Sequence, residues 1–241
     1  MRRDIQWPRI LAEGTAIVLS ILLAFSIDAW WADRKEADAE QRQLHSLLSE
    51  FREARHQLAT QLEGLEVSLG GTLTIFELMG PNATDRTNSE FRAALRDSLD
   101  AGVTAPQQSA LQDVLTFRSS IVSGDAELWL KLQIWPRILG EIEIDGQHLE
   151  NNREKSFVDA LIRLGVPALS VVGPQPGDPE QSGPIQLRPT KFNADLSVLL
   201  RDPGVETVFA MRAIRSQLLI RQHHDAIRFS EEVIGHLEAM F

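Results

Sequence analysis

The hydrophobic positions of this 241-residue chain follow two patterns, one continuous near the N-terminus and one periodic after it. Gly14 to Ile27 contains no charged residue, and the apolar run around it is interrupted only by Glu13 and Asp28, near its ends. A bilayer core of about 30 Å is crossed by about 20 helical residues, so residues 9–31 are long enough to span it. We therefore predict a transmembrane helix at residues 9–31.

The flanks of this run indicate an orientation. Three arginines and one aspartate precede the run, whereas the charges that follow Trp31 are balanced. The positive-inside rule then places residues 1–8 in the cytoplasm and residues 32–241 in the periplasm, with a single pass through a bacterial inner membrane. Tryptophans bracket the run as an aromatic belt does, and the predicted membrane-interface anchors are Trp7, Arg9, Trp30 and Trp31.

Two other interpretations of the run remain open. A cleaved signal peptide also has a basic start and an apolar stretch, and Ala24-Phe-Ser26 resembles a weak cleavage site. A buried core helix is the second alternative. The Trp30-Trp31 pair, followed by unbroken helix-forming sequence, favours the anchor over both.

One face of the predicted span carries small residues every four positions. Small residues at this spacing let transmembrane helices approach closely, and a carboxylate near the boundary is costly when it faces lipid. We expect this face to contact another membrane protein subunit or a second copy of the chain. The predicted packing face comprises Glu13, Ala16, Ser20, Ala24 and Asp28.

After the span, the apolar positions become periodic. They alternate four and three residues apart, as in a heptad repeat, at Leu44, Leu48, Phe51, Arg55, Leu58, Leu62, Leu65 and Leu69. The span is thus predicted to continue into a stalk helix over residues 32–69 that ends at Gly70-Gly71. This pattern fits a coiled-coil dimer or the first helix of an intramolecular bundle, and the similar helices that follow favour the bundle.

The rest of the chain also has helical periodicity, so the predicted fold class is all-α. Thr87 and Glu90 form a capping box for a helix that ends near Gly102. Pro106 suits the first position of a helix, and Asp125 caps another that Pro136 should kink or interrupt. Further helices are predicted at residues 153–164, 192–200 and 205–240, and the stretch 165–190, which is rich in Pro and Gly, is predicted to be one long loop.

Charge and composition narrow the partners. The segment up to Trp31 is neutral overall, so the whole net charge of −10 falls on the remainder. An acidic domain disfavours nucleic acid as a partner and disfavours a polybasic lipid-binding surface. The chain has no Cys, which excludes disulfides and thiol nucleophiles.

No motif for catalysis, cofactor binding or metal binding is present. The phosphate-binding glycine loops, the Gly-x-Ser-x-Gly elbow and the His-Glu-x-x-His pattern do not occur. His223, His224 and Asp225 are consecutive and point in different directions on a helix, so we interpret them as solvated surface. The same interpretation applies to Glu231-Glu232 and to Glu141 with Glu143.

The span resembles an uncharacterised family of bacterial single-pass membrane proteins. That family has Glu, an apolar stretch with a small residue, and then Ala-Leu-Gln-Ile-Asn-Asn-Trp. The matching positions here are Glu13, Ser20, Ala24, Ser26, Asp28 and Trp30. Ser26 stands where the family has Gln, and Asp28-Ala29 where it has Asn-Asn. The resemblance implies a membrane anchor followed by a helical domain, and it implies no activity.

We therefore expect a non-enzymatic, membrane-anchored accessory subunit that docks onto a larger inner-membrane complex. The alternative is a periplasmic helical sensor or ligand-binding module that signals through a partner. A third alternative is an enzyme using acidic residues of the loop, which a deep pocket lined by carboxylates would favour.

Overall fold

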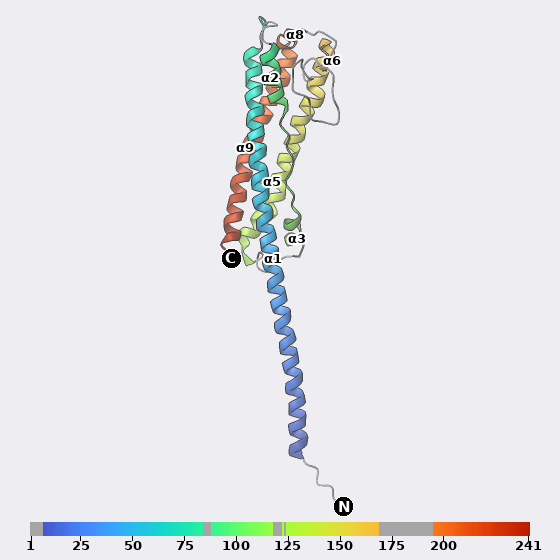
Figure 1. Cartoon of the computed structure of the whole chain (residues 1–241), viewed down its shortest axis with the longest axis vertical. Coiled ribbons are helices and arrows are strands. Elements are labelled where there is room, and N and C mark those ends of the chain that lie inside the picture. Colours follow the sequence, from blue (N-terminus) through green and yellow to red (C-terminus); the bar gives the residue numbers. More distant parts are fainter. Residues whose placement is uncertain (1–6, 84–87, 118–121, 123, 169–194) are drawn as a thin grey trace, which may run out of the picture.

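The computed structural model is an elongated bundle of helices from which one helix extends far beyond the others (Figure 1). It describes residues 7–83, 88–117, 122, 124–168 and 195–241, and within these ranges the side chains of residues 7–20, 32, 33, 36, 88 and 117 are excluded. The described residues contain helices and irregular segments but no strand, which confirms the all-α bundle. The helices are α1 (Trp7–Leu78), α2 (Asn88–Leu99), α3 (Ser109–Phe117), α5 (Ala126–Asn151), the π-helix η2 (Asn152–Phe157), α6 (Val158–Leu164), α8 (Ser197–Leu200) and α9 (Pro203–Glu238).

Helix α1 runs for 72 residues and passes through Gly70 and Gly71 without a break. The predicted end of the stalk helix at residue 69 is therefore wrong. At Gly71 the backbones of α1 and α2 pack closely, because a Cβ there would lie 2.5 Å from the Ala94 carbonyl oxygen and 2.6 Å from the Ser98 amide nitrogen. The glycine thus serves helix packing instead of helix termination, while Gly70 faces open space.

The buried seam of α1 differs from the predicted one at three positions, Arg55, Leu62 and Leu69. Leu44, Phe51, Leu58 and Leu65 are buried as predicted, and Leu48 is buried too. Arg55 is exposed, however, and Leu62 and Leu69 are only half-buried. Buried residues lie one position before the predicted ones at Leu47, Ala54 and Ser68, and the seam continues to Ile75, while Gln61 is half-buried like Leu62. This seam packs against α9, α2 and α3 of the same chain, as the intramolecular bundle requires.

Helices α5 and α9 complete the main bundle, and both begin at an aspartate N-cap. Asp125 Oδ1 accepts hydrogen bonds from the Glu127 and Leu128 amides, as predicted for this cap. Asp202 Oδ1 accepts from the Val205 amide at 2.9 Å. Helix α5 continues through Pro136, so the predicted interruption there is absent. The predicted helix at 205–240 corresponds to α9.

Two other predicted boundaries move. The helix expected to begin at Pro106 begins at Ser109, because Glu50 of α1 supplies its cap. The Glu50 carboxylate accepts from the Ala110 amide at 2.7 Å and from the Leu111 amide at 3.0 Å. The helix predicted at 153–164 is a direct continuation of α5 through η2 into α6. Most of the predicted loop at 165–190, the start of the helix predicted at 192–200 and Thr87 of the predicted capping box lie outside the described residues.

A polar layer divides the core into two apolar clusters. The larger cluster joins α1, α5 and the C-terminal half of α9, and the smaller one joins α2, α6, α8 and the start of α9. Between them lies Arg212, only 1% exposed, whose Nε donates to the Ser98 carbonyl oxygen at 2.7 Å. The Ser68 hydroxyl donates to the same oxygen at 2.6 Å. Burial lowers the pKa of Arg212 to about 10.

Candidate functional site

The predicted transmembrane segment lies in the part of α1 that extends away from the bundle (Figure 1). Its described side chains from Ile21 to Trp31 are all exposed, and the large apolar ones are 48% to 67% exposed. Successive residues are turned by about 100° around a helix, so the neighbours Ile21, Leu22 and Leu23 cover most of its circumference. Large apolar side chains therefore surround this segment, with Ser26 and Asp28 as its polar residues, unlike the one-sided seam that follows it.

The structure describes only part of the predicted packing face and anchors. Ala24 and Asp28 are exposed, one turn apart on α1. Trp30 and Trp31 are exposed and meet edge to face, with ring centroids 5.6 Å apart. The structure does not describe the side chains of the other predicted residues, which are Trp7, Arg9, Glu13, Ala16 and Ser20.

The Ser26 hydroxyl finds its partner within the helix. It donates to the Leu22 carbonyl oxygen at 2.8 Å. A hydroxyl bonded in this way needs no water, which suits an apolar surrounding. Among the residues that the structure describes, no helix is both long enough and apolar enough to cross a membrane. The span at 9–31, whose first half has no described side chains, stays a prediction.

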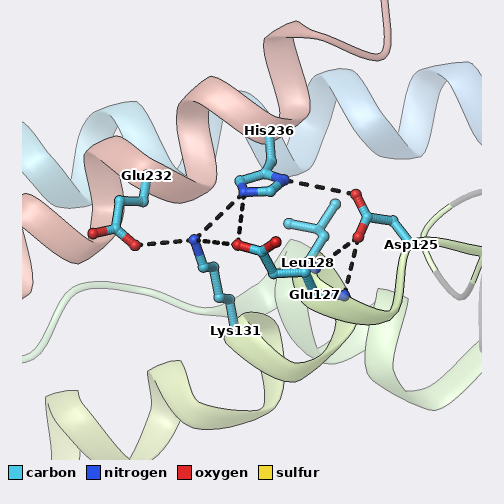
Figure 2. A network of polar contacts seen from close by, with 6 residues as sticks. All are labelled: Asp125, Glu127, Leu128, Lys131, Glu232 and His236. Carbon is cyan, nitrogen blue, oxygen red and sulfur yellow. Dashed lines mark hydrogen bonds and ion pairs between the residues drawn. The ribbon is translucent and has the colours of Figure 1, made fainter.

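A second feature lies at the end of the bundle from which α1 emerges. Five side chains, which we call the base cluster, join the start of α5 to the end of α9 (Figure 2): Asp125, Glu127, Lys131, Glu232 and His236. Lys131 Nζ lies 2.9 Å from Glu232 Oε2 and 3.1 Å from Glu127 Oε1. His236 Nδ1 lies 3.6 Å from Asp125 Oδ2, and its Nε2 lies 3.3 Å from Glu127 Oε1.

The charges around His236 are held by their own hydrogen bonds. The bond to Glu232 raises the pKa of Lys131, and the same bond lowers the pKa of Glu232. The Leu128 amide, followed by smaller contributions that include His236, lowers the pKa of Asp125. These groups therefore keep their charges near neutral pH.

The opposite flank of α9 ties the C-terminus to α1. Arg52 donates to Glu238 Oε1 at 2.6 Å, and Arg55 lies 3.9 Å from Glu231. The C-terminal Phe241 stacks on His45, with ring centroids 4.3 Å apart. The last turns of α9 are thus held between α5 and the stretch of α1 that leaves the bundle.

The prediction that His223 is solvated surface is wrong, since its side chain is 0% exposed. Its Nδ1 lies 2.8 Å from the Leu219 carbonyl oxygen and its Nε2 lies 3.2 Å from Gln61 Oε1. Burial lowers the pKa of His223, against the smaller raising effect of the Leu219 carbonyl. His224 and Asp225 are exposed, as predicted.

Sequence reasoning also missed the base cluster. It interpreted Glu232 as ordinary surface, whereas this exposed residue pairs with Lys131 across the bundle. The available signal was the Asp125 cap with Glu127 and Lys131 one turn apart, but nothing local placed the end of α9 beside them. Among the residues that the structure describes, no three His, Asp or Glu side chains are grouped to hold a metal ion. The expectation of no catalytic, cofactor or metal site stays a prediction.

Comparison with known proteins gives no further guide to this site. No protein-family model matches the chain, and no curated protein or solved structure matches it either. The resemblance to a family of single-pass membrane proteins also stays a prediction.

Proposed function

We propose that this protein is a non-enzymatic accessory subunit, anchored in the bacterial inner membrane by residues 9–31 and carrying its helical bundle in the periplasm. The proposal is carried by one observation, the exposed large apolar side chains that surround α1 between Ile21 and Trp31. A large exposed apolar surface is unfavourable in water and marks a site that another apolar phase covers.

The dimensions support a bilayer as that phase. Residues 9–30 of an α-helix measure about 33 Å, which matches a hydrocarbon core of about 30 Å. The Trp30-Trp31 pair then lies at one boundary, where aromatic side chains are favoured. From Trp31 to Leu44, where the buried seam begins, the exposed helix spans about 20 Å, so the base of the bundle stands above the membrane surface.

The stripe of small residues supports a role in docking. Ala24 and Asp28 lie on the same face of α1, and both are exposed to whatever surrounds the segment. A carboxylate in this position is favoured only when it faces a polar group of a partner or the headgroup region. A partner span packed on this face would satisfy Asp28 and exploit the close approach that Ala24 allows.

Membrane anchoring is tested by alkaline carbonate extraction of membranes from cells that express the full chain. We expect the wild type to stay in the pellet. Replacement of Leu22 and Leu23 by Arg should release it, because each Arg costs about 3 kcal/mol in a membrane helix. The matched control replaces Ile162 and Ile214, which are equally exposed on the bundle, and should stay in the pellet. Release of the wild type would refute the anchor.

Docking is tested by native electrophoresis of the protein extracted in mild detergent. Ala24→Ile enlarges the predicted face, whereas Ser26→Ile makes a similar change about 200° around the helix. We expect a defined assembly in the wild type and in Ser26→Ile, and its loss in Ala24→Ile. A monomer in all three, with membrane insertion retained, would refute the accessory-subunit function.

A further inference from the structure

His236 occupies an unusual position between a cation and an anion. Its Nε2 lies 3.4 Å from Lys131 Nζ and 3.3 Å from Glu127 Oε1 (Figure 2). A lysine ammonium can only donate a hydrogen bond, and a carboxylate can only accept one. The same ring nitrogen is therefore offered two partners of nearly equal distance that require opposite protonation states.

Asp125 determines which nitrogen of the neutral ring carries the proton. Its Oδ2 lies 3.6 Å from His236 Nδ1, and a carboxylate in that place favours the tautomer with a proton on Nδ1. Nε2 is then unprotonated in the neutral ring and accepts from Lys131. When the ring takes up a second proton, Nε2 becomes a donor, and Glu127 is the acceptor beside it.

We propose that His236 is a proton-operated clamp at the base of the bundle. In the neutral state its Nε2 accepts from Lys131, and in the protonated state it donates to Glu127 while Nδ1 donates to Asp125. Nδ1 carries a proton toward Asp125 in both states, so protonation exchanges the Nε2 bond to Lys131, in the second turn of α5, for a bond to Glu127 in its first turn. The contacts to Asp125 and Glu127 are then both charge-assisted. The last turn of α9 is drawn onto the N-terminus of α5.

The surrounding charges favour this closure. Asp125, Glu127 and Glu232 surround Lys131, and the nearby Arg228 of α9 is paired with Asp225, so four carboxylates oppose two cations and the proton enters a site with negative excess. The end of a helix also favours a cation, and His236 lies in the last turn of α9. From α1, Arg52 and Arg55 pair with Glu238 and Glu231 on the other flank of α9. From α3, the charged residue is the exposed Asp113.

The clamp acts on the exit of α1 from the bundle. The turn after His236 ends in Phe241, which stacks on His45 of α1. Fixing this turn on α5 fixes the Phe241 ring on His45, and loosening it frees both. This inference goes beyond the proposed function and holds whether or not α1 enters a membrane.

Thermal unfolding of the full chain in mild detergent, followed at pH 8 and at pH 5.5, tests the clamp. His236→Gln removes the titration, and His224→Gln is the control because His224 is exposed on the same helix. The proposed closure places the protonated ring between Asp125 and Glu127, which the unfolded chain does not hold beside it, so the clamp should stabilise the fold at pH 5.5 and not at pH 8. We expect the Tm of the wild type, relative to His236→Gln, to rise by about 2–4 °C on acidification. An unchanged difference would overturn the proposal.

Partner exchange has its own readout in the NMR titration of the His236 ring. Glu127→Gln removes the partner of the protonated ring, so the midpoint should move to lower pH. Lys131→Met removes the donor to the neutral ring and the competing charge, so the midpoint should move to higher pH. Movement of both midpoints in one direction, or of neither, would overturn the clamp.

Discussion

Replacing Gly71 by Ala places a methyl group where α1 and α2 leave no room. The new Cβ would lie 2.5 Å from the Ala94 carbonyl oxygen, 2.6 Å from the Ser98 amide nitrogen and 2.9 Å from Asp97 Cβ. Two of these atoms are backbone, so side-chain rotation cannot relieve the contact and the helices must separate. Overpacking of this kind costs about 1–3 kcal/mol.

Gly70→Ala is the matched control, because a Cβ there meets nothing within 4 Å. Both variants gain about 1 kcal/mol from the higher helix propensity of Ala, so this gain cancels in their difference. We expect Gly70→Ala to be more stable than Gly71→Ala by about 2 kcal/mol, or about 4–8 °C in Tm, because overpacking acts only at Gly71. Circular dichroism melts of the full chain in mild detergent measure this difference. Equal melting temperatures would refute the close-approach explanation of Gly71.

Three further substitutions test the polar interior and the helix caps. In urea titrations, Arg212→Met should change the unfolding free energy by less than about 1 kcal/mol, because the Ser98 carbonyl oxygen keeps its hydrogen bond from Ser68. Arg212→Ala should cost about 3 kcal/mol, because it leaves a cavity. Burial lowers the pKa of His223, so below about pH 6.5 the unfolded chain binds a proton there that the folded chain does not, and the wild type should lose stability. In measurements of Tm against pH, His223→Gln should reduce that loss. Arg163 lowers the pKa of Asp202, so the stabilisation by Asp202 should be present near neutral pH and lost on acidification below the ordinary titration range of Asp. In chemical denaturation, Asp202→Ala should therefore cost about 1 kcal/mol of unfolding free energy at neutral pH and little near pH 3.

The buried residues of a helix can be predicted from the sequence where the buried residues are also the apolar ones. On α5, the apolar residues that recur four and three positions apart are all buried, and Asp125 caps the helix as expected; these residues are Leu128, Leu132, Trp135, Leu139 and Ile142. On α1 the same reasoning selects the half-buried Leu69 and misses the buried Ser68 beside it, because it follows apolar residues alone. Ser68 is buried since Arg212 and Ser98 meet it there, and that requirement comes from two other helices.

The candidate site illustrates the same limit. The exposed apolar segment is continuous in sequence, so Trp30 and Trp31 were found from the chain alone. The base cluster joins Lys131 to Glu232 and His236, which are far apart in sequence, through packing that no local pattern encodes.

Because α1 runs unbroken from Trp7 to Leu78, the rotation of the apolar segment about the helix axis and its distance from the bundle are both fixed by the number of residues between them. Each residue inserted between Trp31 and Leu44 would rotate the Ala24 face by about 100° relative to α9 and lift the bundle by about 1.5 Å. Seven inserted residues would nearly restore the azimuth, within about 20°, while adding about 10 Å of height. The length of this exposed stretch therefore encodes the direction in which the bundle faces as well as its distance from the apolar segment.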